Sequence, residues 1–121
     1  MKHLTFFSYP SCTSCRKTKN WLKARNVDFK ERHLFRDTPT IDELKLILKL
    51  TTEGIDEILA TRSRTYKDLN KDINDFSLSE LLTLIHKEPK LLRRPIITDG
   101  NQLVVGYNPQ ELSKLARKQG A

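Results

Sequence analysis

The chain has 121 residues and a net charge of +7, because its 22 Lys and Arg outnumber its 15 Asp and Glu. This length fits one domain that can bury a core without disulfides. No apolar run approaches the roughly 20 residues of a membrane span, and the N-terminal stretch lacks the layout of a signal peptide. We therefore expect a cytoplasmic protein that does not associate with membranes, in which any disulfide would be transient and catalytic or sensing.

The first predicted elements form a β-α-β unit. Residues 4–8 are a short apolar run typical of a strand, and residues 14–25 predict a helix whose Trp21 and Leu22 face inward. Residues 27–34 partly alternate between apolar and polar side chains, which predicts a second strand.

Residues 38–90 are predicted to form a helical insertion. Thr40-Ile41-Asp42-Glu43 and Ser77-Leu78-Ser79-Glu80 have the form of capping boxes, which mark helix starts. Gly54 is expected to end or break the first helical segment. The inward-facing stripes are expected to be Ile41, Leu44, Ile47 and Leu48 in the first helix, and Leu78, Leu81, Leu82 and Ile85 in the second.

The last part of the chain returns to β structure. Residues 95–98 and 103–106 flank Asp99-Gly100-Asn101, a hairpin turn signal, and Asn108-Pro109 opens a final helix. This order predicts an α/β, thioredoxin-like fold with an added helical lobe. The whole chain, residues 1–121, would form one domain, with its core at about 1–37 and 91–121.

The two cysteines, Cys12 and Cys15, stand where the first strand gives way to the first helix. A C-x-x-C motif in this place is the layout of a thioredoxin-like redox site. Free N–H groups and the positive end of the helix dipole stabilise a thiolate there, and Arg16 and Lys17 add positive charge. We expect Cys12 to be the more exposed thiol with the lower pKa, and Cys15 to lie close enough to form a disulfide with it.

The cysteines also allow two other interpretations. A structural zinc site needs about four ligands, and only His3, His33 and His86 remain as partners, none of them at partner spacing. The cysteines could also be inert buried thiols, since free cysteine packs well in cores. Pro10 and Ser11 before a cationic helix favour an exposed turn, so redox chemistry is preferred, with no metal and no cofactor.

The segment Arg93-Arg94-Pro95-Ile96 is a second candidate site. In thioredoxin-like folds a proline before the third strand lies beside the C-x-x-C turn, commonly with a cis bond. Arg94 would then point toward a thiolate or a bound anion. The alternative is a proline that merely starts a strand, and the sequence does not decide between them.

Basic residues cluster in four places, and each cluster alone is most simply a solvated helix face. The overall excess also fits nucleic acid, an anionic substrate or an acidic protein surface. The clusters are Arg16, Lys17, Lys19, Lys23 and Arg25; Arg62, Arg64 and Lys67; Lys87, Lys90, Arg93 and Arg94; and Lys114, Arg117 and Lys118.

Five separated segments carry a family resemblance: PSCTSCRK (residues 10–17), TTEGIDEI (51–58), TRS (61–63), LLRRPI (91–96) and VGYN (105–108). Together they resemble the Spx family of arsenate-reductase-related thioredoxin folds, over nearly the whole chain. The resemblance implies a redox-sensing transcription regulator of stress genes. Such a protein binds the C-terminal domain of the RNA polymerase α subunit and is switched by a reversible Cys12–Cys15 disulfide.

The resemblance also implies residue roles. Gly54 matches a polymerase contact, Arg94 with Pro95 and Arg62 match the switch and anion partners, and Arg62 with Arg64 match a basic stretch linked to promoter contact. No helix-turn-helix or zinc finger is visible, so we expect promoter DNA to be contacted only in the polymerase complex.

Two further expectations concern partners. Some relatives continue into a tail recognised by the ClpXP protease. Here the chain ends soon after the final predicted helix, which puts such a partnership in question. A monomer is expected, since no exposed apolar stripe is left over once the core is assigned.

The competing function is an arsenate reductase or another thiol-disulfide oxidoreductase, because both classes share this fold. Cys12, Arg62 and Arg94 match three places of the reductase site, but the remaining arginine falls at residues 106–108, where no cation stands. A lost charged contact to an oxyanion costs about 1.5–3 kcal/mol. This loss and the second cysteine favour a regulator over an enzyme.

Overall fold

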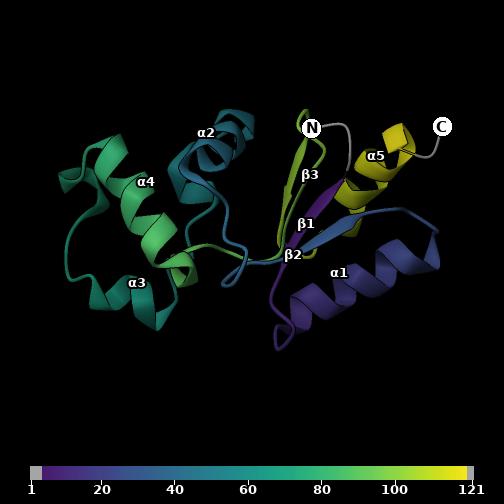
Figure 1. The fold of residues 1–121 in the computed structure, drawn as a ribbon, viewed down its shortest axis with the longest axis horizontal. Coiled ribbons are helices and arrows are strands. Elements are labelled where there is room, and N and C mark those ends of the chain that lie inside the picture. Colours follow the sequence, from purple (N-terminus) through teal and green to yellow (C-terminus); the bar gives the residue numbers. More distant parts are fainter. Residues whose placement is uncertain (1–3, 120–121) are drawn as a thin grey trace.

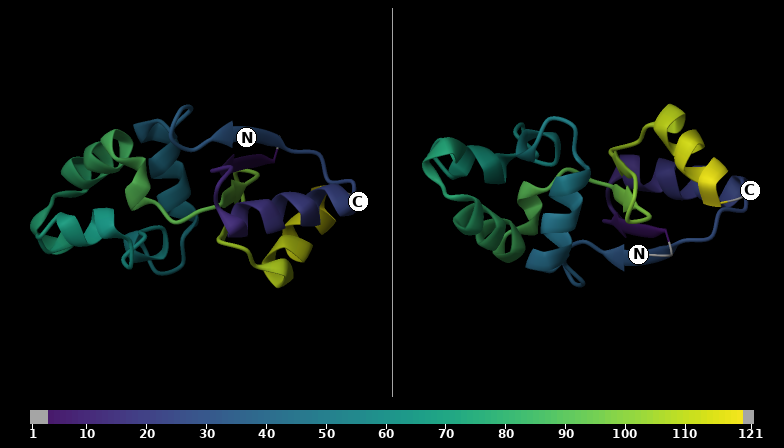
Figure 2. Two further views of the ribbon diagram at one scale, coloured as in Figure 1. Left: turned by 90° about the horizontal axis from the view of Figure 1, so that it is seen from below. Right: turned by 90° about the horizontal axis from the view of Figure 1, so that it is seen from above.

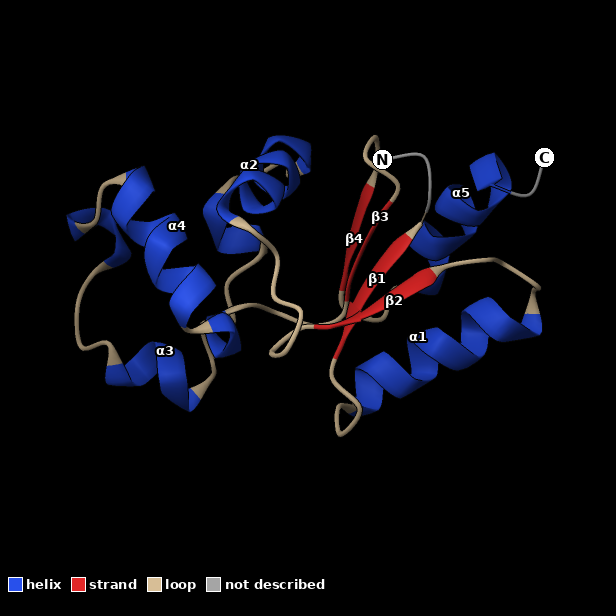
Figure 3. Cartoon of the chain, in the orientation of Figure 1, coloured by secondary structure: helices blue, strands red, loops and turns tan. Residues whose placement is uncertain are grey.

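The first strand, β1 (Thr5–Ser8), lies at the centre of the sheet. In the computed structural model, which describes residues 4–119 and only the backbone of residues 117–119, the strand order is β2-β1-β3-β4. β1 pairs in parallel with β2 (Lys30–His33) and antiparallel with β3 (Ile96–Thr98), and β3 pairs antiparallel with β4 (Leu103–Val105). Figure 3 shows these strands as the inner layer of the molecule.

Helices cover both faces of this sheet. In Figures 1 and 2, α1 and α5 lie on one side of the strands, and α2, α3 and α4 lie on the other. The helices are α1 (Thr13–Ala24), α2 (Ile41–Leu50), α3 (Arg64–Asp68), α4 (Leu78–Lys87) and α5 (Pro109–Gln119), with short 3₁₀ turns at Ile55–Glu57, Ile73–Asp75 and Pro89–Leu91. The predicted order of strands and helices is confirmed, although the second strand is shorter than the predicted 27–34.

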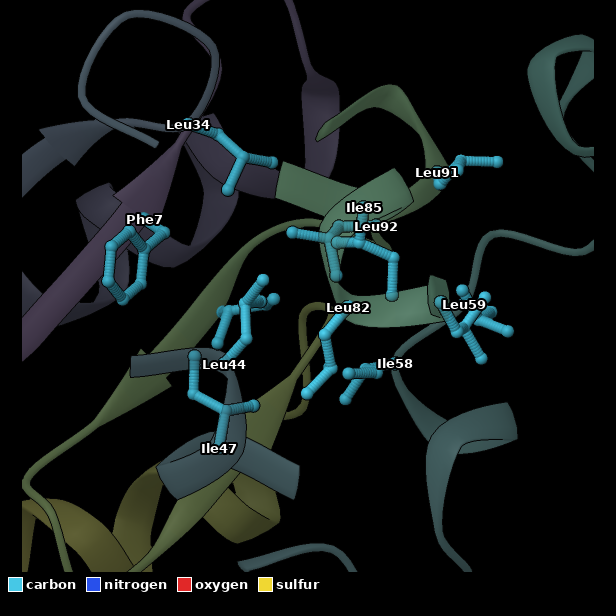
Figure 4. Packing of buried hydrophobic residues seen from close by; sticks show 12 residues of the cluster. Phe7, Leu34, Leu44, Ile47, Ile58, Leu59, Leu82, Ile85, Leu91 and Leu92 are labelled. Atoms are coloured by element: carbon cyan, nitrogen blue, oxygen red, sulfur yellow. The ribbon is translucent and has the colours of Figure 1, made fainter. Parts of the chain in front are cut away.

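Alternation along the strands divides the buried side chains into two clusters. Phe6 and its partner Ile97 face α1 and α5, where they pack with Trp21, Leu22, Leu112 and Leu115. Phe7 and its partner Ile96 face the helical lobe. Figure 4 shows Phe7 near the leucines and isoleucines of that lobe. Each cluster removes a set of large apolar side chains from water, the main favourable term in folding.

Local signals set the helix starts. Both predicted capping boxes are present. At the start of α2 the Thr40 side chain accepts the Glu43 N–H and the Glu43 side chain accepts the Thr40 N–H, and Ser77 and Glu80 form the same pair of bonds at the start of α4. The prediction that Leu78 faces inward was wrong, since it is 54% exposed. Leu78 is the first residue of α4, and the buried stripe of that helix is formed by Leu81, Leu82 and Ile85.

Candidate redox site

Cys12 and Cys15 take different positions at the start of α1. Cys12 is the N-cap residue, with an extended backbone (φ −86°, ψ 123°), and it is half-buried. Cys15 lies on the inner face of the first turn and is 2% exposed. Both are free thiols. The prediction that Cys12 is the more exposed sulfur is confirmed.

The environment of Cys15 disfavours its ionisation. Burial is the main cause that raises its pKa to about 12, and a hydrogen bond with the Cys12 side chain acts in the same direction. The Tyr9 N–H, which donates to Cys15 Sγ over 3.4 Å, and the charge of Arg94 act in the opposite direction but are outweighed. Cys15 therefore stays a thiol at neutral pH, and Cys12 is the sulfur that a reagent in solution reaches first.

Arg94 and Pro95 complete this site. The Arg94–Pro95 peptide is cis, as the first of the two alternatives for this proline expected, and Pro95 directly precedes β3, as the second expected. Arg94 is half-buried, its Cζ atom lies 5.9 Å from the centre of the Tyr9 ring and 5.4 Å from that of Phe35, and its Nη1 donates to the Leu92 carbonyl over 3.5 Å. Its charge acts on Cys15. Cys12, Cys15 and Arg94 thus lie in one neighbourhood, and Pro95 adjoins Arg94 in the chain.

Arg62 and Arg64 lie elsewhere, at the start of α3. Both are exposed. Arg62 lines a pocket of about 430 Å³ together with Asp56, Ser63 and Arg93, and the lining of this pocket includes neither Cys12 nor Arg94. The sequence matched Arg62 and Arg94 to one anion site, but they contribute to different surroundings here.

Gly54 precedes the 3₁₀ turn Ile55–Glu57 and has a backbone that other residues rarely adopt (φ 87°, ψ −155°). A Cβ atom at this position would have no neighbour within 4 Å among the described residues. Glu57 fixes the preceding loop, because its Oε2 accepts from the N–H groups of Thr52 and Glu53 over 2.8 and 3.1 Å. Gly54 therefore stands on an ordered, open surface.

Sequence reasoning missed two residues around these sites, Tyr9 and Phe35, which flank Arg94, and it gave no role to Arg93. Arg93 Nη1 donates to the Glu57 carbonyl over 3.2 Å, and its Nη2 would lie 3.4 Å from a Cβ atom on Gly106. Gly106, with φ 78°, leaves room for that guanidinium. The basic cluster at residues 87–94 was visible in the sequence, but nothing local indicated which arginine turns toward which neighbour.

Among residues 4–119, no three His, Cys, Asp or Glu side chains are grouped so that they could hold a metal ion. His3, which was considered as a zinc partner, lies outside the described residues, as do the side chains of Arg117 and Lys118 in the last basic cluster. None of the described helices is long and apolar enough to cross a membrane.

Known proteins resemble this chain over nearly its full length. The ArsC family matches residues 7–115. Regulatory protein MgsR of Bacillus subtilis (strain 168) is 65% identical over 117 residues, which are 97% of this chain and 93% of that protein. The global transcriptional regulator Spx of Staphylococcus aureus (strain Mu50) is 51% identical over 116 residues, which are 95% of this chain and 88% of that protein.

One solved structure supports the same grouping. The crystal structure of an ArsC-family-related protein from Bacteroides fragilis has a TM-score of 0.84 at 31% identity, and the match covers 95% of this chain and 98% of that one. The thioredoxin-like, arsenate-reductase-type fold predicted from the sequence is therefore confirmed.

Proposed function

Because the chain belongs to the ArsC family and, within it, to the regulators of the Spx type, we propose that it is a transcription regulator that senses oxidants through Cys12 and Cys15. In this proposal it binds the C-terminal domain of the RNA polymerase α subunit and controls stress genes. The observation that carries the redox part is the unequal placement of the two sulfurs. Cys12 is half-buried at the helix start, whereas Cys15 is buried one turn further and stays protonated.

The proposed switch is a two-electron oxidation. The Cys12 thiolate attacks one oxygen of a hydroperoxide, the O–O bond breaks, and the leaving alkoxide takes a proton, so that Cys12 becomes a sulfenic acid. Cys15 then loses its proton and attacks that sulfur, the S–O bond breaks, and water leaves. In total, two thiols and one hydroperoxide give one disulfide, one alcohol and one water. The high pKa of Cys15 limits the second step, so the sulfenic acid on Cys12 is expected to persist long enough to be trapped.

Gly54 is the proposed contact with the polymerase domain. Its Cα atom faces open space, and its loop is held by Glu57. A glycine with open space beside it admits close approach by a partner, whereas a large side chain there would project into the interface. Promoter DNA would be contacted through exposed cations such as Arg62 and Arg64 only after the polymerase has placed the protein, because phosphate contacts position a protein without reading sequence.

The enzyme alternative is less well supported. A reductase needs its nucleophile and its arginines to converge on one oxyanion. Arg62 lines a pocket with Arg93, and that pocket does not include Cys12. The names of the similar proteins, a regulatory protein and a global transcriptional regulator, point the same way.

The test is binding of the purified protein to the isolated polymerase α C-terminal domain, in dithiothreitol and after oxidation with diamide. Diamide takes two electrons and two protons from the cysteine pair as its N=N bond is reduced. We expect saturable binding that Gly54→Arg abolishes. Gly54→Ala is the matched control, because it has the same backbone strain without the long side chain.

The outcomes separate the two parts of the proposal. Binding lost in Gly54→Arg but retained in Gly54→Ala supports the contact. A difference between the reduced and oxidised protein that disappears in Cys12→Ala supports the switch. Absence of binding in both redox states would overturn the regulator proposal, and turnover of arsenate with glutathione and glutaredoxin would then be measured.

A further inference from the structure

Tyr9 contacts both cysteines through its backbone. Its carbonyl accepts the Cys12 N–H over 3.0 Å, and its own N–H donates to Cys15 Sγ over 3.4 Å. A disulfide requires the two sulfurs to approach to about 2.05 Å. Closing it therefore changes the surroundings of a sulfur to which the Tyr9 N–H donates.

The side chain of Tyr9 belongs to a group of rings around Arg94. Its ring centre lies 4.7 Å from that of Phe35 and 5.8 Å from that of His33. His33 Nδ1 accepts the N–H groups of Phe35 and Arg36 over 3.2 and 3.3 Å, which fixes the turn that carries Phe35. The guanidinium of Arg94 lies near the Tyr9 and Phe35 rings. Such contacts between a cation and aromatic rings are attractive and directional.

Little else in the described residues fixes the head of Arg94. Its hydrogen bond to the Leu92 carbonyl is long at 3.5 Å, and no carboxylate lies within 4.0 Å of its nitrogen atoms among residues 4–116. The two rings are therefore the neighbours best placed to determine where this charge lies relative to the cysteines.

We propose that Tyr9 is a positioning residue of the redox site, whose ring, backed by Phe35, holds the Arg94 guanidinium beside the cysteine pair. This inference rests on the proposed function and names how the pair is tuned. A positive charge stabilises a sulfur anion of the reduced pair and has no such effect on the neutral disulfide. Because Cys15 stays protonated, this anion is formed on Cys12. Arg94 held beside the pair by Tyr9 thus favours the reduced state.

The test is a redox titration in glutathione buffers at pH 9, where an ordinary thiol is more than half ionised. Tyr9→Ala removes the ring but keeps both backbone contacts, and Tyr9→Phe keeps the ring. We expect Tyr9→Ala to shift the equilibrium toward the disulfide by about 2- to 5-fold, the effect of one cation–ring contact. Tyr9→Phe should behave like the wild type.

A double-mutant cycle separates positioning from packing. If Tyr9 acts through Arg94, Tyr9→Ala has no further effect on the equilibrium in an Arg94→Ala protein. Tyr107→Ala is the matched control, because Tyr107 is also near the start of α1, with the centre of its ring 6.0 Å from Lys17 Nζ, whereas the rings near Arg94 are those of Tyr9 and Phe35. The effect of Tyr107→Ala on the redox equilibrium should be the same in the wild-type and the Arg94→Ala backgrounds.

Three results decide the matter. An equal shift by Tyr9→Ala in both backgrounds would overturn the inference while leaving the switch intact. A wild-type protein that forms no disulfide at any glutathione ratio would instead overturn the proposed function, and the inference with it. If Tyr9→Ala unfolds, as checked by circular dichroism, Phe35→Leu replaces it in the same cycle, and additive effects there would contradict the role of the ring pair.

Discussion

The reduced protein is expected to lose folding stability at alkaline pH, and replacing Cys15 with alanine should make this loss smaller. Cys15 is 2% exposed, and its pKa is raised from 9.0 to about 12. The unfolded chain loses this proton near pH 9, whereas the folded protein keeps it. Since the unfolded state then binds fewer protons, the free energy of unfolding falls as the pH rises from 9 toward 12.

The size of the effect follows from the two pKa values. At about pH 8 both states keep the proton, and the stability contributed by the buried thiol is fully present. At about pH 10 the unfolded thiol is roughly 90% ionised, while the folded thiol is roughly 1% ionised. One pH unit beyond the unfolded pKa corresponds to about 1.4 kcal/mol, which is the expected loss.

The assay is urea unfolding in a phosphine reductant at both pH values, followed by the fluorescence of Trp21, the single tryptophan, which is 8% exposed. Other groups also titrate in this range, so the free energy of unfolding of the wild type is compared with that of Cys15→Ala at each pH. The difference between the two proteins should shrink by about 1.4 kcal/mol from pH 8 to pH 10. Cys12→Ala, which keeps Cys15, should retain most of the alkaline loss. Equal losses in wild type and Cys15→Ala would refute the raised pKa of the buried thiol.

Three further predictions use the same unfolding assay. Leu82→Ala empties part of the core of the lobe, where Leu82 is fully buried, and should cost about 2–5 kcal/mol; a cost below 1 kcal/mol would contradict tight packing there. Ser77→Ala removes the N-cap of α4 and should cost about 1 kcal/mol of folding stability. Ser79→Ala is the control, because Ser79 lies in the same turn and is not the N-cap residue. Arg32→Met leaves the Glu43 carboxylate without its ion pair and should cost about 1.5–3 kcal/mol at neutral pH. Burial acts to raise the pKa of Glu43, but the hydrogen bond and charge of Arg32, together with the hydrogen bonds of Thr40, outweigh it and lower that pKa below 4.5. The stability from this pair is therefore present above pH 4.5 and lost as the pH falls further, and the cost of Arg32→Met should shrink in acid.

Features that depend on a few adjacent residues could be predicted from the sequence. Both capping boxes were found because the cap and its glutamate stand three residues apart. The hairpin between β3 and β4 followed from its turn residues, and Gly100 indeed takes a φ of 92°. The unequal exposure of Cys12 and Cys15 followed from their places before and inside the first turn of a helix.

Features that join distant segments could not be predicted in this way. The order β2-β1-β3-β4 depends on pairing between residues about 25 and 90 positions apart, and no local pattern specifies it. The rings around Arg94 come from two separate segments, near residues 9 and 33–35. Leu78 was misplaced because a periodic stripe does not reveal that the first turn of α4 extends beyond the core.

The contacts around residues 91–94 suggest how a change at the cysteines could reach Gly54. The segment that follows Gly54 is bound to the segment that precedes Arg94: the Ala60 N–H donates to the Leu91 carbonyl over 2.7 Å, and the Arg93 N–H donates to the Ile58 carbonyl over 2.8 Å. Leu59 and Leu92 form an antiparallel bridge between them, and both side chains are buried in the same cluster (Figure 4).

This arrangement makes the two proposed sites parts of one packed unit. Arg94 and the 3₁₀ turn after Gly54 adjoin the same end of the bridge, one in each segment, and there the Arg93 side chain donates to the Glu57 carbonyl. Packed interiors move as rigid pieces and do not deform gradually. A displacement of Arg94 on oxidation would therefore be carried into the loop of Gly54. A short bridge of this kind explains how one disulfide could alter a contact surface on the other side of the sheet without rearranging the fold.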